Sequence, residues 1–195
     1  MHDLSKMRMH TKVVHAGQRP DPETGAVSIP IYQSSTFRFR DADEGADRFA
    51  GRDPGHIYTR LGNPTTDHLE EAIALMEGGC GALGAASGMA AVNTVYFALL
   101  GQGSHVVATE SLYGPSRMVL ETEYKRYGVS ATFVDSSDAQ NVARAMRPET
   151  KLVYIETPSN PTLKLTDIRA CAEIAHAGGA LLCVDNTFCS PLLQR

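Results

Sequence analysis

The chain has 195 residues, of which 43% are hydrophobic and 21% are charged, proportions that are usual for a globular protein with a buried core. Its formal net charge of -4 and its scattered Lys and Arg residues exclude the basic surface that is typical of nucleic-acid binding or of binding to anionic membranes. We therefore expect a small molecule or another protein as its ligand.

Residues 1 to about 40 show neither helical nor strand periodicity, and prolines and turn residues interrupt them. So long an irregular segment is uncommon inside a compact domain unless it packs on a partner or performs a function. Four residues look as if they would be buried, which argues against a loose tail: Ile29, Ile31, Tyr32 and Phe37. We interpret residues 1–62 as an N-terminal arm and dimer-contact segment, and residues 63–195 as the first part of a larger domain.

Two helices are predicted next. The first begins after Asn63, a good N-cap, with Pro64 at its first position, and it ends at Gly78 and Gly79. Its apolar face carries Leu69, Ile73 and Met76. The second helix should begin near Ser87, and four residues lie on its predicted inner side: Met89, Val92, Tyr96 and Leu99.

From residue 105 onward, short apolar segments alternate with helical patterns. Strands are predicted at 105–109, 131–135, 151–156 and 180–185, and helices at 115–127, 138–146 and 167–177. This alternation predicts an α/β fold with a mostly parallel sheet that is covered by helices on both faces. Ligands of such folds bind beyond the carboxyl ends of the strands, so candidate site residues are expected there.

The sequence "GCGALG", residues 79–84, matches the G-x-G-x-x-G pattern of dinucleotide-binding proteins. That pattern requires a strand before it and a helix that opens on its last glycine. Here a predicted helix precedes the pattern, and its first glycines resemble a helix end. A nicotinamide oxidoreductase would require this segment to follow a strand.

The segment "AASGMAAV", residues 85–92, predicts a helix N-terminus at which Gly88 and Met89 present free N–H groups to an anion. On these residues alone, a well-capped core helix is the simpler interpretation. No G-x-S-x-G pattern marks Ser87 as a nucleophile.

Polar side chains also follow two predicted strands, in "ETPSNP" and "VDNTFCSP". Asp185 ends an apolar run and needs a cationic or donor partner, which could be a Lys, an Arg, a backbone cap or a protonated ring nitrogen such as that of pyridoxal. Tyr113 could stack on a flat cofactor or pack in the core. Tyr58 and Arg60 suit phosphate binding, although a solvated Arg is more frequent.

The four cysteines form no C-x-x-C pair and follow no apolar secretory segment, so we expect reduced thiols in the cytoplasm. The seven histidines show no H-E-x-x-H pattern, and we predict no metal site. The most apolar window, residues 89–100, is too short to span a bilayer, which takes about 20 residues.

Six collinear stretches together resemble the cystathionine γ-synthase and methionine γ-lyase family of pyridoxal-phosphate enzymes. They are "AGQRPDPETGAVSIPIYQSSTF", "YTRLGNPTTDHLEEAIALMEGG", "ASGMAA", "LYGPS", "ETPSNP" and "VDNTFCSPLLQR", and they cover nearly the entire chain. The resemblance implies the large domain of the aspartate-aminotransferase-like fold (fold type I), preceded by an arm that lies across a partner subunit. It also implies pyridoxal 5'-phosphate as cofactor and a homotetramer built from dimers.

The same resemblance implies a role for each site residue. Tyr58 and Arg60 would bind the cofactor phosphate of a neighbouring subunit, and Ser87, Gly88 and Met89 would bind the phosphate of their own subunit. Four more residues would surround the ring: Tyr113 stacks on it and moves protons at the leaving group, Asn160 contacts its hydroxyl, Asp185 pairs with its nitrogen, and Thr187 lines it. The family's Schiff-base lysine, its carboxylate-binding arginine and its C-terminal domain are expected beyond residue 195.

Within the family, "FAGRDPGHIYTRLGNPTT" and "DNTFCSP" look most like methionine γ-lyases, which convert a small amino-acid substrate to methanethiol, ammonia and 2-oxobutanoate. One departure is Pro115, because methionine γ-lyases usually carry a cysteine there. Cystathionine γ-lyase or γ-synthase activity and homoserine-ester sulfhydrylase activity stay open. So does a different class, a truncated and non-catalytic oligomerisation partner, which the absence of cofactor from the native assembly would favour.

Overall fold

A computed structural model describes residues 4–195, and these form two compact units that divide after Gly84. Among the described residues, no helix has both the length and the apolar character needed to cross a membrane. The functional division that we expect at residue 62 stays a prediction.

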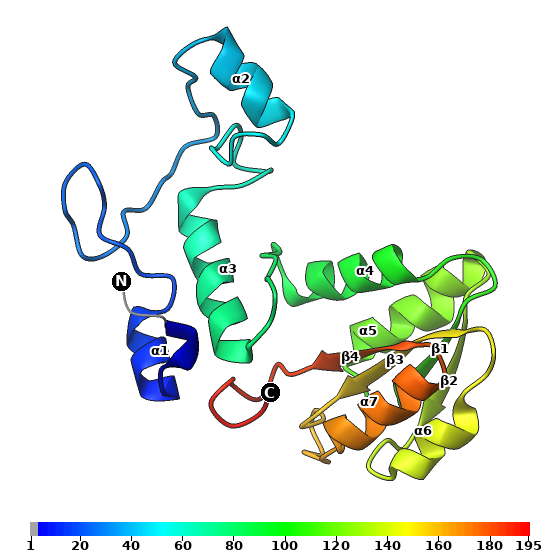
Figure 1. The fold of residues 1–195 in the computed structure, drawn as a ribbon. Helices are drawn as coiled ribbons and strands as arrows, with labels where there is room; N and C mark the ends of the chain where they lie inside the picture. Colours follow the sequence, from blue (N-terminus) through cyan, green and yellow to red (C-terminus); the bar gives the residue numbers. More distant parts are fainter. Residues whose placement is uncertain (1–3) are drawn as a thin grey trace. The chain divides into compact units, whose positions relative to one another are not determined.

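The first unit is helical (Figure 1). Its longest helix, α3 (Pro64–Glu77), begins and ends where the sequence predicts. Asn63 caps it by accepting a hydrogen bond of 2.9 Å from the N–H of Thr65, and Gly78 ends it in the left-handed conformation, with φ at 69°. The other elements are a 3₁₀ turn and two helices: η1 (Leu4–Lys6), α1 (Met9–His15) and α2 (Ala42–Phe49).

The expectation that residues 1 to 40 lack periodic structure is wrong for α1, which packs on α3. This helix has only seven residues and no side-chain N-cap, and it exposes Val13 and Val14, so its sequence carries no apolar stripe that could reveal it. Within the chain itself Ile31 is 83% exposed and Tyr32 is 36% exposed, so the first unit alone does not bury these two residues. Ile29 and Phe37 are half-buried.

The second unit is a parallel sheet with strand order β2-β1-β3-β4 and with helices between the strands. It confirms the predicted alternation, with strand ends shifted by no more than one residue. A π-helical segment, η2, continues α5 within the helix predicted at 115–127. The elements in chain order are α4 (Gly88–Leu99), β1 (His105–Thr109), α5 (Gly114–Val119), η2 (Leu120–Tyr124), β2 (Ser130–Val134), α6 (Ala139–Ala145), β3 (Thr150–Glu156), α7 (Ile168–Ala177) and β4 (Leu181–Asp185).

Helices cover both faces of this sheet, as the sequence predicts (Figure 1). On one face, Val92 and Tyr96 of α4 pack against Val106 and Tyr154 of the sheet. The opposite face packs against α6 and α7. Each fully buried Val or Leu contributes about 1.5–3 kcal/mol to folding, so the two cores hold the strand ends in place.

The carboxyl ends of β3 and β4 lie side by side, because Glu156 pairs in register with Asp185. Polar side chains from both strands therefore meet at one edge of the sheet. By contrast, "GCGALG" follows the end of helix α3 rather than a strand. This position rules out the nicotinamide-binding interpretation.

Candidate functional site

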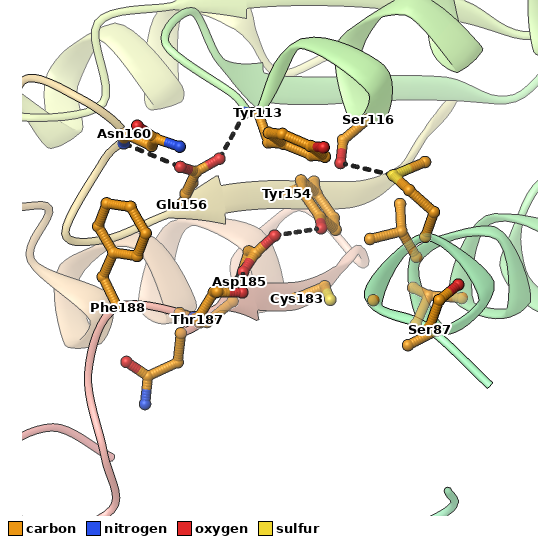
Figure 2. A pocket seen from close by; sticks show the side chains of 17 residues that line it. Ser87, Tyr113, Ser116, Tyr154, Glu156, Asn160, Cys183, Asp185, Thr187 and Phe188 are labelled. Carbon is orange, nitrogen blue, oxygen red and sulfur yellow. Dashed lines mark hydrogen bonds between the residues drawn. The ribbon is translucent and has the colours of Figure 1, made fainter. Parts of the chain in front are cut away.

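A cavity of about 620 Å³ lies at the carboxyl edge of the sheet and is lined entirely by residues of the second unit. Figure 2 shows its side chains converging from α4, from the start of α5 and from the ends of β3 and β4. The structure brings together here seven of the nine predicted site residues: Ser87, Gly88, Met89, Tyr113, Asn160, Asp185 and Thr187.

Asp185 has hydrogen-bond donors but, among the described residues, no ion-pair partner. Its Oδ2 atom accepts a hydrogen bond of 3.2 Å from the Tyr154 hydroxyl, and its Oδ1 atom accepts from both the N–H and the hydroxyl of Thr187. Within residues 85–195, no Lys or Arg forms an ion pair with this carboxylate. A half-buried carboxylate without a cation can attract a positively charged group of a ligand.

The N-terminus of α4 forms another wall of the cavity. Ser87 caps the helix by accepting a hydrogen bond of 3.1 Å from the N–H of Ala90. Among the described residues, the N–H groups of Gly88 and Met89 have no partner, as is usual for the first turn of a helix. A Cβ atom added to Gly88 would meet no atom within 4 Å, so an anion can approach these N–H groups.

Tyr113 stands at the start of α5, with its side chain 46% exposed to the cavity and solvent. Its backbone N–H donates a hydrogen bond of 2.6 Å to Oε2 of Glu156. Oε1 of the same carboxylate accepts a bond of 2.9 Å from the N–H of Asn160. Glu156 thus joins the two loops that carry Tyr113 and Asn160, and burial raises its pKa although both N–H bonds oppose that shift.

Glu156 and Tyr154 are the site residues that the sequence reasoning missed. Tyr154 is 2% exposed and Glu156 is 5% exposed, yet both line the cavity. The signal that could have found them is the alternation along a strand, because residues two positions apart point to the same face. Tyr154 and Glu156 of β3 therefore share a face with Cys183 and Asp185 of β4. Burial raises the pKa of the Cys183 thiol to about 11.

The other two predicted site residues, Tyr58 and Arg60, belong to the first unit and line a pocket of about 810 Å³ within it. The Arg60 guanidinium lies over the Tyr58 ring, 5.3 Å from its centre. This segment is held from α2, where Nη1 of Arg48 donates a hydrogen bond of 2.8 Å to the His56 carbonyl. It is also held by a backbone bond of 2.9 Å from Thr59 to Ser35.

Among the residues that the structure describes, no three His, Cys, Asp or Glu side chains gather as metal ligands would. The cavity presents an open helix N-terminus, an aromatic ring and two carboxylates.

Known proteins match the chain along its length. Residues 10–195 match the family described as "Cys/Met metabolism PLP-dependent enzyme". The L-methionine gamma-lyase of Treponema denticola is 45% identical over 99% of this chain and 48% of its own length. Cystathionine beta-lyase MetC of Bacillus subtilis is 47% identical over 96% of this chain and 46% of its own length. The chain spans about half the length of the curated relatives that it matches.

Two solved structures share the fold. The structure of metB from Corynebacterium glutamicum superimposes with a TM-score of 0.89 at 37% identity, covering 97% of this chain and 48% of that one. The structure of cystathionine gamma-lyase from Lactobacillus plantarum, complexed with L-serine, gives a TM-score of 0.85 at 39% identity, covering 95% and 46%. The parallel α/β arrangement is therefore that of fold type I pyridoxal-phosphate enzymes, as the sequence predicts.

Proposed function

Because the chain belongs to the family of Cys/Met metabolism PLP-dependent enzymes, we propose that it acts as a carbon–sulfur lyase on a sulfur amino acid, with L-methionine as the first candidate. In the net reaction, L-methionine and one water yield methanethiol, ammonia and 2-oxobutanoate. The observation that carries the proposal is the cavity in which the cation-free carboxylate of Asp185 and the open N-terminus of α4 occur together.

The residues of the cavity fit pyridoxal 5'-phosphate, the cofactor of the family. The cofactor has a phosphate at one end and a ring nitrogen that carries positive charge when protonated. The α4 N-terminus supplies unpaired donors for an anion, and Asp185 supplies an unpaired negative charge for a cation. When bound, the cofactor supplies an electron sink that stabilises negative charge at Cα of an amino acid.

Each residue then has a proposed task. Gly88 and Met89 bind the phosphate through their N–H groups, and Ser87 holds the helix end that presents them. Asp185 keeps the ring nitrogen protonated, while Thr187 lines the ring and holds Oδ1 of Asp185. The remaining two residues complete the surroundings of the ring: Tyr113 stacks on it and moves a proton at the leaving group, and Asn160 contacts its hydroxyl.

Tyr58 and Arg60 bind the cofactor phosphate of a neighbouring subunit in this proposal. Support comes from the placement of Arg60 over Tyr58 in a pocket of the first unit, because a guanidinium so held presents its N–H fork in one orientation. The proposal includes a homotetramer, built from dimers in which residues 1–62 form the arm, and a cytoplasmic location.

A second candidate substrate class rests on Pro115, which lies in the first turn of α5, two positions after Tyr113 in the chain. A proline there has neither a thiol nor an N–H to offer to a substrate. Cystathionine, or an O-acylhomoserine with a thiol acceptor, is then the alternative substrate. Relatives named cystathionine gamma-lyase and O-succinylhomoserine sulfhydrylase are both 42% identical to the chain.

The native protein tests these proposals. We expect bound pyridoxal phosphate, and from L-methionine equal amounts of methanethiol and 2-oxobutanoate. Faster turnover of cystathionine or of an O-acylhomoserine would favour the second candidate. A native assembly without cofactor would contradict both and would indicate a non-catalytic oligomerisation partner, which the relatives named as lyases do not favour. Asp185→Asn should weaken cofactor binding, because the amide carries no negative charge.

A further inference from the structure

The hydrogen bonds that Asp185 accepts from the described part of the chain leave one acceptor position open. A carboxylate oxygen accepts about two hydrogen bonds. Oδ1 already accepts two, from the N–H and the hydroxyl of Thr187. Oδ2 accepts one, of 3.2 Å, from the Tyr154 hydroxyl. The free position is therefore on Oδ2, the atom that Tyr154 holds.

Tyr154 is a rigid donor. Its side chain is 2% exposed, and its ring packs edge-on against Tyr96 with 5.2 Å between the ring centres. The parallel pairing of β3 with β4 sets Tyr154 opposite Cys183, and Glu156 opposite Asp185. Burial raises the pKa of the Tyr154 phenol, so that the hydroxyl keeps its proton and stays a donor at neutral pH. Figure 2 shows this hydroxyl directed at Asp185.

We propose that Tyr154 is a positioning residue, whose hydroxyl orients Asp185 so that Oδ2 accepts the N–H of the cofactor ring. This inference rests on the proposed binding of pyridoxal phosphate. Without the hydroxyl, only Thr187 holds the carboxylate of Asp185. The carboxylate then rotates more freely about the Cβ–Cγ bond. In some of these orientations, Oδ2 of Asp185 points away from the ring nitrogen, and the attraction between the carboxylate and the ring is weaker.

The alternative is that Tyr154 only fills space beneath the cavity, and the chain offers a matched control for that alternative. Tyr96 is also fully buried and contacts the Tyr154 ring, but its hydroxyl has no hydrogen-bond partner among the described residues. Replacing either tyrosine by phenylalanine removes one oxygen from the same packed cluster. Only the Tyr154 change removes a bond to Asp185.

The experiment measures the dissociation constant of pyridoxal phosphate from the native apoprotein and from its variants, together with their urea unfolding. We expect Tyr154→Phe to weaken binding about tenfold, because the ring nitrogen then pairs with a carboxylate that Tyr154 no longer orients. Tyr96→Phe should change binding less than about twofold. In an Asp185→Asn background, Tyr154→Phe should also change it less than about twofold, because the two residues act through one bond.

Equal effects of the two phenylalanine variants would overturn the inference, as would an undiminished effect of Tyr154→Phe in the Asp185→Asn background. A Tyr154→Phe variant that fails to fold would overturn it too, because a hydroxyl that only positions Asp185 is not needed for folding. If the unmodified protein does not bind pyridoxal phosphate, then the proposed function itself fails. If instead the parent and Tyr154→Phe bind pyridoxal phosphate equally well, then only the inference about Tyr154 fails and the proposed function stands.

Discussion

The carboxylate of Glu156 accepts a hydrogen bond of 2.6 Å from the backbone N–H of Tyr113, although 43 positions separate the two residues in the chain. The bond ties the start of α5 to the end of β3. A second bond, of 2.9 Å from the N–H of Asn160, ties the following loop to the same carboxylate. Two walls of the cavity therefore depend on one buried side chain that itself has no assigned role in chemistry.

We predict that Glu156→Gln destabilises the protein by about 1–3 kcal/mol. Glutamine has one oxygen where glutamate has two, so its amide group would face one of the two N–H donors and leave that donor unpaired. Urea unfolding measures the loss, and hydrogen exchange should show faster exchange at Tyr113 or Asn160.

Glu173→Gln is the matched control, because Glu173 lies exposed on α7 and should change stability by less than about 0.5 kcal/mol. Equal stability of the two variants would show that Glu156 does not hold the loops.

A second prediction concerns Arg48 of the first unit, which holds the segment that carries Tyr58 and Arg60. Arg48 is 16% exposed and binds both Glu44 and the His56 carbonyl at 2.8 Å. We expect Arg48→Met to release residues 56–60 and to raise their rate of hydrogen exchange about tenfold, because the loss of a partner from a buried network is costly.

Arg52→Met provides the comparison, since Arg52 pairs with Asp47 on the surface and such pairs contribute little. Exchange at residues 56–60 should then change less than about twofold. Unchanged exchange in Arg48→Met would mean that α2 does not hold this segment.

Most of the fold, but not all of it, could be predicted from the sequence. The strands at 105–109 and 151–156 were predictable because they are buried runs of β-branched and apolar residues between helical patterns. Helix α3 was predictable from Asn63, Pro64 and Gly78, whose local chemistry begins and ends a helix. Helix α1 was not predictable, since its stability comes from packing on α3 and not from a pattern of its own.

In the candidate site, too, some residues could be predicted from the sequence and others could not. Strand ends and a capped helix pointed to Ser87 and Asp185, and the family resemblance supplied the tasks of Tyr58 and Arg60. The task of Glu156 depends instead on two backbone N–H groups from different loops. No spacing within the sequence reveals such bonds, because they form only after the sheet brings the loops together.

Buried His105 provides a prediction about pH. Its ring nitrogens bond to the Thr150 and Thr132 hydroxyls at 2.8 and 2.9 Å, and the side chain is almost fully buried. Burial, and then Arg147, lower the pKa of this imidazole, against a smaller opposing effect of Glu149. The folded protein thus holds His105 neutral at a pH where the unfolded chain has already bound a proton.

Stability is therefore expected to fall as the pH drops below about 6.5, the ordinary value for histidine, by up to about 1.4 kcal/mol per pH unit. The loss should level off once the pH lies below the lowered pKa of the folded state. Urea unfolding between pH 7.5 and 5 measures this dependence. His105→Gln should flatten it, whereas His176→Gln, at an exposed position of α7, should leave it as in the parent. The same slope in both variants would contradict the assignment to His105.

The reactivity of the cysteine thiols tests how well the protein shields Cys183, which lines the cavity. Burial raises the pKa of both Cys171 and Cys183 to about 11, so well under 1% of either thiol is ionised at pH 7.5. Cys80 is exposed. In the folded protein, iodoacetamide should therefore modify exposed Cys80 first and half-buried Cys183 much more slowly, whereas fully buried Cys171 should react only after unfolding. Peptide mass spectrometry identifies the modified residue at each time.

Cys80→Ser should remove the fast phase of this reaction, whereas Cys183→Ala should leave the fast phase unchanged. Cys183 lines the cavity beside Tyr154 and Asp185, so bound pyridoxal phosphate should slow its reaction still further. If Cys183 in the folded protein is labelled as fast as Cys80, then solvent reaches this part of the cavity freely. The Tyr154–Asp185 hydrogen bond would then have to compete with water, and its influence on a bound ring would be correspondingly small.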